Sequence, residues 1–223
     1  LGCVSVICTD KTGTLTQNKM TPQTIYFYNH LMKISELDNR HHDHSVLLKS
    51  CLLCNNAVIN GEQRIGDPTE LALIDLVHEY TKNDIEFKHT AVRTSELPFD
   101  SDRKLMSISS LNHIYTKGAP DVIIKRCSTI LINGIKEPIT KRHLDAIEKE
   151  NQRCANNGLR VLGFAYKGYR GNQVTLEDEH DLTFIGLVSL MDPPRIESQD
   201  AVAKCKIAGI KPIMITGDHV VTA

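Results

Sequence analysis

A single carboxylate, Asp10, stands where a buried strand is expected to end. Residues 3–9 are mostly apolar and β-branched, which is typical of a short buried strand. Asp10 follows at once, and Lys11, small hydroxyl residues and a glycine come next. In open α/β sheets, reacting groups lie just beyond the carboxyl ends of the strands. A carboxylate beside a cation at that position suits nucleophilic attack on a phosphoryl group; the simpler alternative is a polar turn after a strand.

The C-terminal part of the chain shows a similar arrangement. Residues 183–188 and 212–216 have the pattern of buried strands, and Asp218 comes soon after the second of them. Residues 196–208 between them carry apolar side chains near one helical face, with Gly209 as a C-terminal stop. A strand–helix–strand order favours a parallel sheet. We therefore predict that both ends of the chain form one doubly wound domain with the two carboxylates at the same edge.

The middle of the chain has a different pattern. Asp67, followed by Pro68, is expected to begin a helix that runs to about Tyr80, and Glu70 completes a capping-box spacing. The other elements expected here are strands at 105–110, 114–116 and 161–166 and helices at 120–127 and 139–157. This mixture indicates an inserted α+β module. We expect it to span residues 29–178, with residues 1–28 and 179–223 forming the domain that it interrupts, and with polar hinges at the borders.

Composition narrows the class of protein. The chain has 26 basic and 27 acidic residues, so its charge gives no sign of a nucleic-acid-binding surface. No apolar run approaches the roughly 20 residues that span a bilayer, and we expect this stretch to be soluble as given. Seven cysteines, an odd number, favour a reduced intracellular protein. The Cys-x-x-Cys at 51–54 fits a helix face in the core better than zinc or redox chemistry, and the His-rich run 41–44 fits a solvated loop better than a metal site.

Six stretches, in this order, resemble the motifs of the P-type ATPases, cation pumps that form an aspartyl-phosphate. They are Asp-Lys-Thr-Gly-Thr-Leu-Thr at 10–16, Gly-Asp-Pro-Thr-Glu at 66–70, Pro-Phe-Asp-Ser-Asp-Arg-Lys at 98–104, Lys-Gly-Ala-Pro at 117–120, Met-Asp-Pro-Pro-Arg at 191–195 and Thr-Gly-Asp at 216–218. The resemblance covers essentially the whole chain. It implies an α/β phosphorylation domain of the haloacid-dehalogenase type, with a Rossmann-like parallel sheet, that is truncated here and interrupted by a nucleotide-binding α+β domain with an antiparallel sheet. ATP and Mg²⁺ are the implied cofactors.

The same resemblance implies roles around Asp10. Asp10 would attack the γ-phosphate of ATP, Lys11 would offset charge on the phosphoryl oxygens, and an Asp10 oxygen and the Thr12 carbonyl would bind Mg²⁺. Related phosphatases have an aspartate at the position of Thr12 that acts as general acid and base; threonine cannot take that role at neutral pH, which favours a long-lived aspartyl-phosphate. Further residues implied at the phosphate are Thr14, Thr216, Gly217 and Asp218, of which Gly217 also fits a simple turn.

In the inserted module the resemblance implies a nucleotide pocket. Phe99 would stack on adenine, although such a phenylalanine is often a core residue. Lys104 and Lys117 would line the pocket, Lys117 being otherwise a surface lysine at a turn. Asp67 would lie near the adenine edge, or serve only as a helix N-cap. The remaining candidates are Arg160 near the phosphates, Arg103 in an assisting role, and Asp192 and Arg195 as hinge-side contacts to ATP, unless Asp192 belongs only to a rigid corner.

Several parts of such a pump are not in this sequence, among them the Gly-Asp-Gly-x-Asn-Asp segment, the actuator domain and the transmembrane helices. We therefore expect the chain alone to bind ATP or ADP weakly without efficient turnover, with the rest of the pump as its partner and the cytoplasmic face of a membrane as its location. Residues 212–219 and the compact insertion most resemble calcium pumps of bacteria. Alternatives are a sodium/potassium, proton or magnesium pump, a phosphatase of the haloacid-dehalogenase superfamily, and a non-catalytic nucleotide-binding module.

Overall fold

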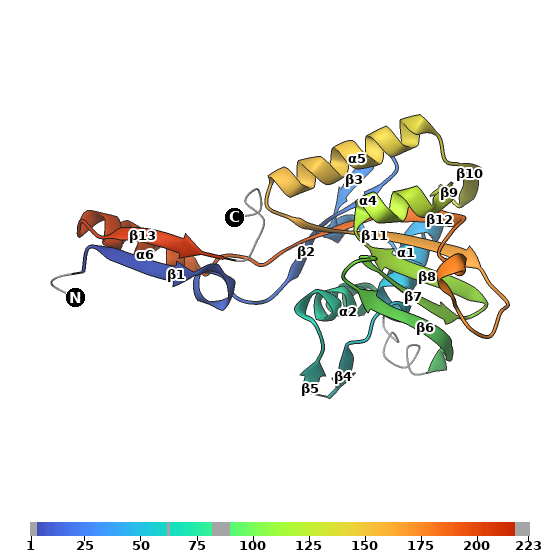
Figure 1. Ribbon diagram of the computed structural model, residues 1–223, viewed down its shortest axis with the longest axis horizontal. Helices are drawn as coiled ribbons and strands as arrows, with labels where there is room; N and C mark the ends of the chain where they lie inside the picture. The colour runs from blue at the N-terminus through green and yellow to red at the C-terminus, as the bar shows by residue number, and fades with distance from the viewer. Residues whose placement is uncertain (1–3, 62, 82–89, 217–223) are drawn as a thin grey trace.

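Two separate sheets organise most of the chain in this computed structural model, which describes residues 4–61, 63–81 and 90–216. The larger sheet has nine strands in the order β10-β9-β12-β11-β8-β7-β6, and β2 and β3 extend from β12. Its strands are β2 (Thr21–Phe27), β3 (His30–Lys33), β6 (Arg93–Asp100), β7 (Leu105–Ser110), β8 (His113–Gly118), β9 (Cys127–Ile132), β10 (Ile135–Pro138), β11 (Arg160–Gly168) and β12 (Leu182–Met191). Figure 1 shows this larger unit set apart from a small unit that holds both ends of the described chain.

The strand β12 is the centre of the larger sheet. It pairs antiparallel with β11 along one side, and its other side is shared between β9, which is parallel to its first part, and β2, which is antiparallel to its second part. Nearly every residue of β12 is buried. Burial on both faces explains why this strand is a continuous apolar run without polar alternation.

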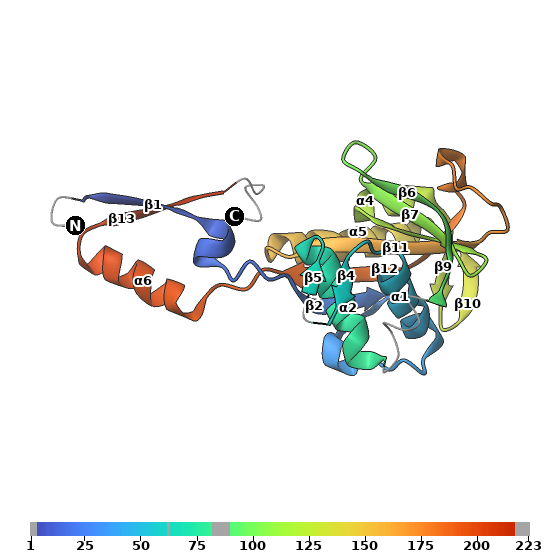
Figure 2. The same ribbon diagram turned by 90° about the horizontal axis from the view of Figure 1, so that it is seen from below.

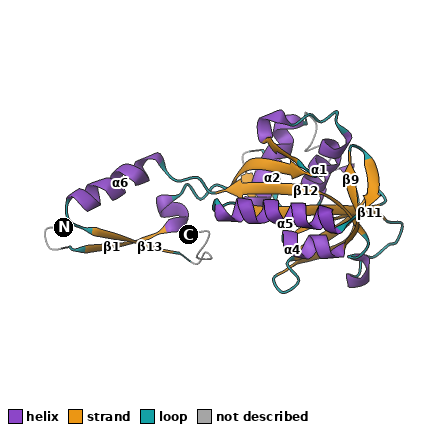
Figure 3. Ribbon diagram, turned by 90° about the horizontal axis from the view of Figure 1, so that it is seen from above, coloured by secondary structure: helices purple, strands orange, loops and turns teal. Residues whose placement is uncertain are grey.

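Helices cover both faces of the larger sheet. On one face lie α1 (His42–Leu53) and α2 (Pro68–Tyr80), and on the other lie α4 (Pro120–Ile123) and α5 (Lys141–Asn156), as Figures 2 and 3 show. Successive side chains of β2 point to opposite faces of the sheet. Ile25 belongs to the core under α1 and α2, and Tyr26 belongs to the core under α4 and α5. None of the helices in the described ranges combines the length and the apolar character needed to cross a bilayer.

Helix α2 begins as its sequence predicts, but without the capping box. Asp67 is the N-cap and its carboxylate accepts a hydrogen bond from Thr69 N at 2.8 Å, with Pro68 in the first turn. Glu70 does not reach back to the N-cap backbone, because its carboxylate is bonded to Lys117 instead. The short hairpin of β4 (Val58–Asn60) and β5 (Gln63–Ile65) leads into this helix.

The small unit confirms that the two ends of the chain pair in parallel. Strand β1 (Val6–Asp10) pairs with β13 (Lys211–Ile215), with α6 (Ile196–Ile207) between β12 and β13 in the chain. The register sets Asp10 opposite Ile215, so Thr216 follows at the same edge of the sheet as the residues after Asp10. Gly209, with φ of 71°, ends α6 as expected.

Three expectations from the sequence are wrong. Residues 21–27 and 182–191 belong to the larger sheet rather than to the doubly wound unit. The reason is that β12 pairs with neighbouring strands on both of its sides, and the prolines that follow it end the strand. The expected helix at 120–127 is shorter, since Cys127 begins β9 after a 3₁₀ turn. The His-rich run begins α1 instead of a loop, and its Asp43 is buried and accepts from Gly134 N at 2.8 Å. The other short 3₁₀ turns are Ile34–Glu36 and Leu176–Asp178.

The chain passes between the two units at residues 16–20 and 192–195, not at the expected hinges. Residues 28–29 form the turn between β2 and β3 within the larger unit. The two crossing segments are hydrogen-bonded to each other: Thr16 Oγ1 donates to Asp192 at 2.5 Å, and Lys19 N donates to the same carboxylate at 3.1 Å. A bridge between Thr16 and Pro194 shows that the segments run antiparallel.

Gly118 is a position where the fold leaves no room for a side chain. A Cβ there would lie 2.2 Å from Lys104 O and 3.0 Å from Leu105 Cα. We expect Gly118→Ala to lower the free energy of unfolding by about 1–3 kcal/mol, measured as a lower urea midpoint with an unchanged slope. Gly168→Ala in β11 is the matched control, because nothing lies within 4 Å of its Cβ position. Equal losses in the two variants would contradict the packing argument.

Candidate active site

Asp10 is the last residue of β1, and its side chain is exposed at the strand end. The next five residues form a tight turn that Thr16 closes by donating its backbone N–H to Lys11 O at 3.1 Å. Gly13 within this turn has φ of 76°, a conformation that glycine adopts without strain. Gly13 N also donates to Thr16 Oγ1 at 3.2 Å. The turn therefore presents Lys11 and Thr12 directly beyond the carboxylate, with Thr14 exposed on its rim.

A pocket of about 270 Å³ lies where this turn faces the larger unit. It brings together five of the residues singled out from the sequence: Lys11, Thr12, Asp67, Arg160 and Asp192. Arg160 Nη1 donates to Thr69 Oγ1 at 2.8 Å, which holds the guanidinium against the first turn of α2. The N-terminus of α2 adds partial positive charge at this place. Two cations and a helix N-terminus can bind an anion such as a phosphate group.

Asp192 and Arg195 contact the turn after Asp10. One oxygen of Asp192 accepts from Thr16 Oγ1 and the other from a backbone N–H, so both are used within the crossing. Arg195 Nη2 donates to Gly13 O at 3.0 Å. These contacts fit the interpretation of residues 192–194 as a rigid corner. Contact of either side chain with ATP stays a prediction.

Phe99, Lys104 and Lys117 do not line that pocket. Phe99 is 63% exposed, which excludes the core interpretation of this side chain. Lys104, also exposed, has its carbonyl bonded by Ala119 N at 3.1 Å, so the β6–β7 turn rests on the end of β8. Lys117 is buried, which excludes the surface-lysine alternative. Thr216 lies at the end of β13, and Gly217 and Asp218 lie outside the described residues.

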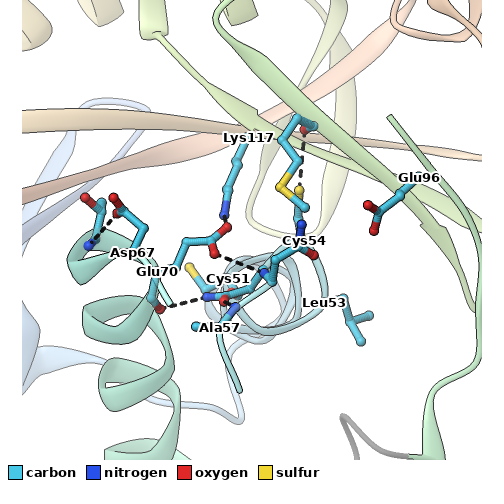
Figure 4. Close-up of polar contacts among 12 residues, drawn as sticks. Cys51, Leu53, Cys54, Ala57, Asp67, Glu70, Glu96 and Lys117 are labelled. Atoms are coloured by element: carbon cyan, nitrogen blue, oxygen red, sulfur yellow. Dashed lines mark hydrogen bonds and ion pairs between the residues drawn. The ribbon is translucent and has the colours of Figure 1, made fainter. Parts of the chain in front are cut away.

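Glu70 is the site residue that sequence reasoning missed. Its Oε1 accepts from Lys117 Nζ at 2.5 Å, and its Oε2 accepts from Asn56 N at 3.2 Å (Figure 4). The one available signal was the spacing from Asp67, which we interpreted as a cap. Residues three apart lie on the same helix face, so Asp67 in the pocket and Glu70 beside Lys117 follow one another along α2. The first turn of α2 thus joins the two groups of candidates.

Arg103 faces the protein rather than the pocket. Its guanidinium is bonded to Glu179, an ion pair that the sequence gave no reason to expect, and to Pro98 O. Its implied role as an assisting nucleotide ligand has no support from these contacts.

The Cys-x-x-Cys pair lies in the core behind Lys117, as expected for a helix face. Cys51 and Cys54 are both fully buried, and Cys54 Sγ contacts Met106 O at 3.4 Å (Figure 4). Burial raises the pKa of the Cys54 thiol to about 11 and that of Cys51 further, partly offset by the charge of Lys117. Thiols that hold their protons this firmly are poor nucleophiles and poor metal ligands. The cysteines in the described ranges form no disulfide.

Oxygen ligands for a cation are present beside the turn. The Asp10 carboxylate and the Thr12 carbonyl are of the kind that Mg²⁺ prefers. Within the described residues, no three His, Cys, Asp or Glu side chains gather closely enough to hold a metal ion by themselves. A bound Mg²⁺ would therefore need further ligands from water, from phosphate or from other residues.

The buried ion pair makes a prediction about stability. Lys117 and Glu70 are 8% and 17% exposed, whereas Arg64 and Asp75, paired at 2.6 Å, are 43% and 36% exposed. Glu70→Ala leaves the Lys117 ammonium buried without its partner, and we expect a loss of about 3 kcal/mol in the free energy of unfolding. Asp75→Ala, the control on the same helix, should cost less than about 1 kcal/mol. Urea unfolding of both variants measures this; a small loss for Glu70→Ala would contradict it.

Comparison of the sequence with known proteins identifies the family of the chain. Residues 43–197 match the sequence profile of the family described as P-type ATPase, cytoplasmic domain N. The whole chain is 42% identical to calcium-transporting ATPase 1 of Bacillus cereus and 40% identical to a calcium-transporting ATPase of Listeria monocytogenes, and it covers 26% of each. It is 36% identical to the potassium-transporting ATPase alpha chain 1 of Xenopus laevis, of which it covers 25%. The chain thus spans about a quarter of the length of these relatives. With its cytoplasmic-domain profile matched over more than half of its length, the chain belongs to the P-type ATPases.

Proposed function

We propose that this chain is the nucleotide-binding and phosphate-accepting part of a cation pump, in which ATP donates its γ-phosphate to Asp10. The observation that carries the proposal is the shared pocket. Lys11 and Thr12, which follow the carboxylate, line it together with Asp67 and Arg160 of the larger unit. A nucleotide bound on the larger unit can therefore direct its phosphates toward the strand end that bears Asp10.

The proposed reaction is an in-line phosphoryl transfer. A carboxylate oxygen of Asp10 attacks the γ-phosphorus, the bond from that phosphorus to the β–γ bridging oxygen breaks, and ADP leaves. Lys11 and Arg160 offset the negative charge that spreads over the phosphoryl oxygens, which is the main task of protein groups in this chemistry. The Asp10 carboxylate and the Thr12 carbonyl would hold Mg²⁺, which would supply further positive charge for the transfer. Thr12 cannot act as a general acid or base at neutral pH, so nothing at that position speeds hydrolysis of the aspartyl-phosphate.

The adenine end of the nucleotide is proposed to lie against Phe99. Support comes from its exposure, since an aromatic ring that solvent reaches offers a face for a base to stack on. Lys104 ends the turn that follows the strand of Phe99, and Lys117, in β8, is paired with Glu70. The first turn of α2 runs from Glu70 to Asp67, which gives a path from the adenine side to the phosphate pocket.

The remainder of the pump is proposed to supply what the chain lacks: an actuator domain, further residues of the phosphorylation domain and the membrane-spanning helices. The small unit, with its parallel β1 and β13 and α6, is proposed to belong to a domain of the haloacid-dehalogenase type at the cytoplasmic face of a membrane. Calcium is the proposed ion, because three relatives named for calcium reach 40–42% identity, above the 35–37% of those named for potassium or sodium/potassium; a fourth relative named for calcium is 36% identical.

Loss of the Phe99 ring tests the nucleotide half of the proposal. Stacking of a base on an aromatic side chain contributes about 1–3 kcal/mol in nucleic-acid complexes, so we expect Phe99→Ala to weaken ATP binding about ten-fold or more. Isothermal titration calorimetry of the 223-residue chain measures the Kd. Val92→Ala is the control, because Val92 is a similarly exposed apolar side chain next to the same strand. An unchanged Kd for Phe99→Ala removes the adenine assignment.

Replacement of the nucleophile tests the catalytic half, in the full-length pump that contains this chain. We expect the wild-type pump to take label from γ-labelled ATP as an acid-stable, hydroxylamine-sensitive product that requires its cation. Asp10→Asn should carry no label, and Asp200→Asn, at an exposed position of α6, should be labelled normally. Labelling that survives in Asp10→Asn rules out the proposed nucleophile. Label that turns over without any cation favours a phosphatase.

A further inference from the structure

Glu179 is a charged side chain that solvent does not reach. It follows the 3₁₀ turn that precedes β12, and its Oε1 accepts hydrogen bonds from Arg103 Nη1 and, at 2.6 Å, from Ser107 Oγ. Its Oε2 is 3.9 Å from Arg126 Nη1. Among the buried side-chain oxygens and nitrogens of the described residues, this Oε2 has no hydrogen-bond partner. A buried carboxylate is costly unless it is paired. Stability alone therefore does not explain why Glu179 is buried in this core.

The Oε1 side of Glu179 is fixed to strands β7 and β8 of the larger sheet. Ser107, which donates to it, also lies 2.9 Å from Thr116 Oγ1, oxygen to oxygen. Both hydroxyl residues are fully buried, on the neighbouring strands β7 and β8. Glu179 is thus a rigid acceptor that the sheet holds in one place.

Arg103 carries this rigidity to the β6–β7 turn. While Nη1 bonds to Glu179, Nη2 donates to Pro98 O, the carbonyl immediately before Phe99. The backbone N–H of Arg103 donates to Asp100 Oδ1 at 2.8 Å, within the same turn. One guanidinium therefore connects the buried carboxylate with the backbone that bears the exposed ring. Phe99, being 63% exposed, has too little packing around its ring to fix its direction, so its backbone must do so.

We infer that Glu179 is a positioning residue for the adenine platform: through Arg103 it holds the Pro98–Phe99 backbone so that the Phe99 ring faces the nucleotide. This rests on the proposed function, in which Phe99 stacks on adenine. It also gives Arg103 a role different from that of a nucleotide ligand, since both ends of its guanidinium are used inside the protein. Arg126 contacts the same carboxylate but not the turn, and donates to Glu179 O at 3.3 Å.

A double-mutant cycle tests the inference on the 223-residue chain. ATP Kd values are measured by calorimetry for the wild type, Glu179→Gln, Phe99→Ala and the double variant. Glu179→Gln keeps the volume and removes the charge that strengthens the bond to Arg103. We expect it to weaken ATP binding about five-fold, the equivalent of one hydrogen bond. In the Phe99→Ala background the same substitution should change the Kd by less than about two-fold, because the platform that it positions is already gone.

Arg126→Ala is the matched control. It removes a cation from the same carboxylate without touching the link to Pro98, so thermal unfolding should show a lower Tm for both Arg126→Ala and Glu179→Gln. Only Glu179→Gln should lose ATP affinity. Equal loss of affinity in Arg126→Ala would mean general loosening and would overturn the inference. An equal effect of Glu179→Gln with and without the Phe99 ring, or no effect on the Kd at all, would overturn it too.

These outcomes separate the inference from the function on which it rests. If the wild-type chain binds ATP and Phe99→Ala weakens that binding, the function stands, and the Glu179 arms alone decide the inference. If the wild type binds no ATP, or Phe99→Ala binds it unchanged, the adenine assignment itself is wrong and the inference falls with it.

Discussion

The antiparallel contact between residues 15–19 and 192–195 is the constraint on which the rest of the arrangement depends. Asp192 accepts from Thr16 Oγ1 and from Lys19 N, and Arg195 donates to Gly13 O in the turn after Asp10. These bonds set the turn that bears Lys11 and Thr12 against the first turn of α2, and the pocket exists because of that placement. A carboxylate at a strand end is chemically ordinary; followed directly by residues that line a pocket with a helix N-terminus and two cations, Asp10 becomes a candidate acceptor for a phosphoryl group.

Helix α2 links the two halves of the site. Its N-cap residue lines the pocket that also holds Lys11 and Arg160, and one turn later Glu70 is paired with the buried ammonium of Lys117. A buried ion pair is seldom the most stabilising choice for a core, since well-packed apolar side chains serve as well or better. The larger unit has two such pairs with little exposure, Glu70 with Lys117 and Glu179 with Arg103.

Local patterns predicted most of the elements and some of the side-chain roles. The strand at 105–110, the N-cap at Asp67 and the parallel pairing of the chain ends all follow from short-range apolar pattern and capping chemistry, and the structure confirms them. The membership of 182–191 did not follow, because a strand buried on both faces fits either sheet until its ladder partners are known. Glu70 and Glu179 were missed for a similar reason. Each of these glutamates is defined by its pairing with a cation, 47 positions away for Glu70 and 76 positions away for Glu179. A local sequence pattern does not predict a contact between residues so far apart in the chain.

The two crossing segments leave the larger sheet from adjacent strands, β2 and β12, which are hydrogen-bonded up to Thr21 and Met191. The two crossing segments leave the sheet side by side and are hydrogen-bonded to each other, which restricts how the small unit can move relative to the larger one. If the two segments slid apart or twisted independently, the hydrogen bonds between them would break. Rotation of the small unit about the line through the paired segments keeps these bonds. The paired segments therefore leave rotation about their common line as the main relative motion of the two units.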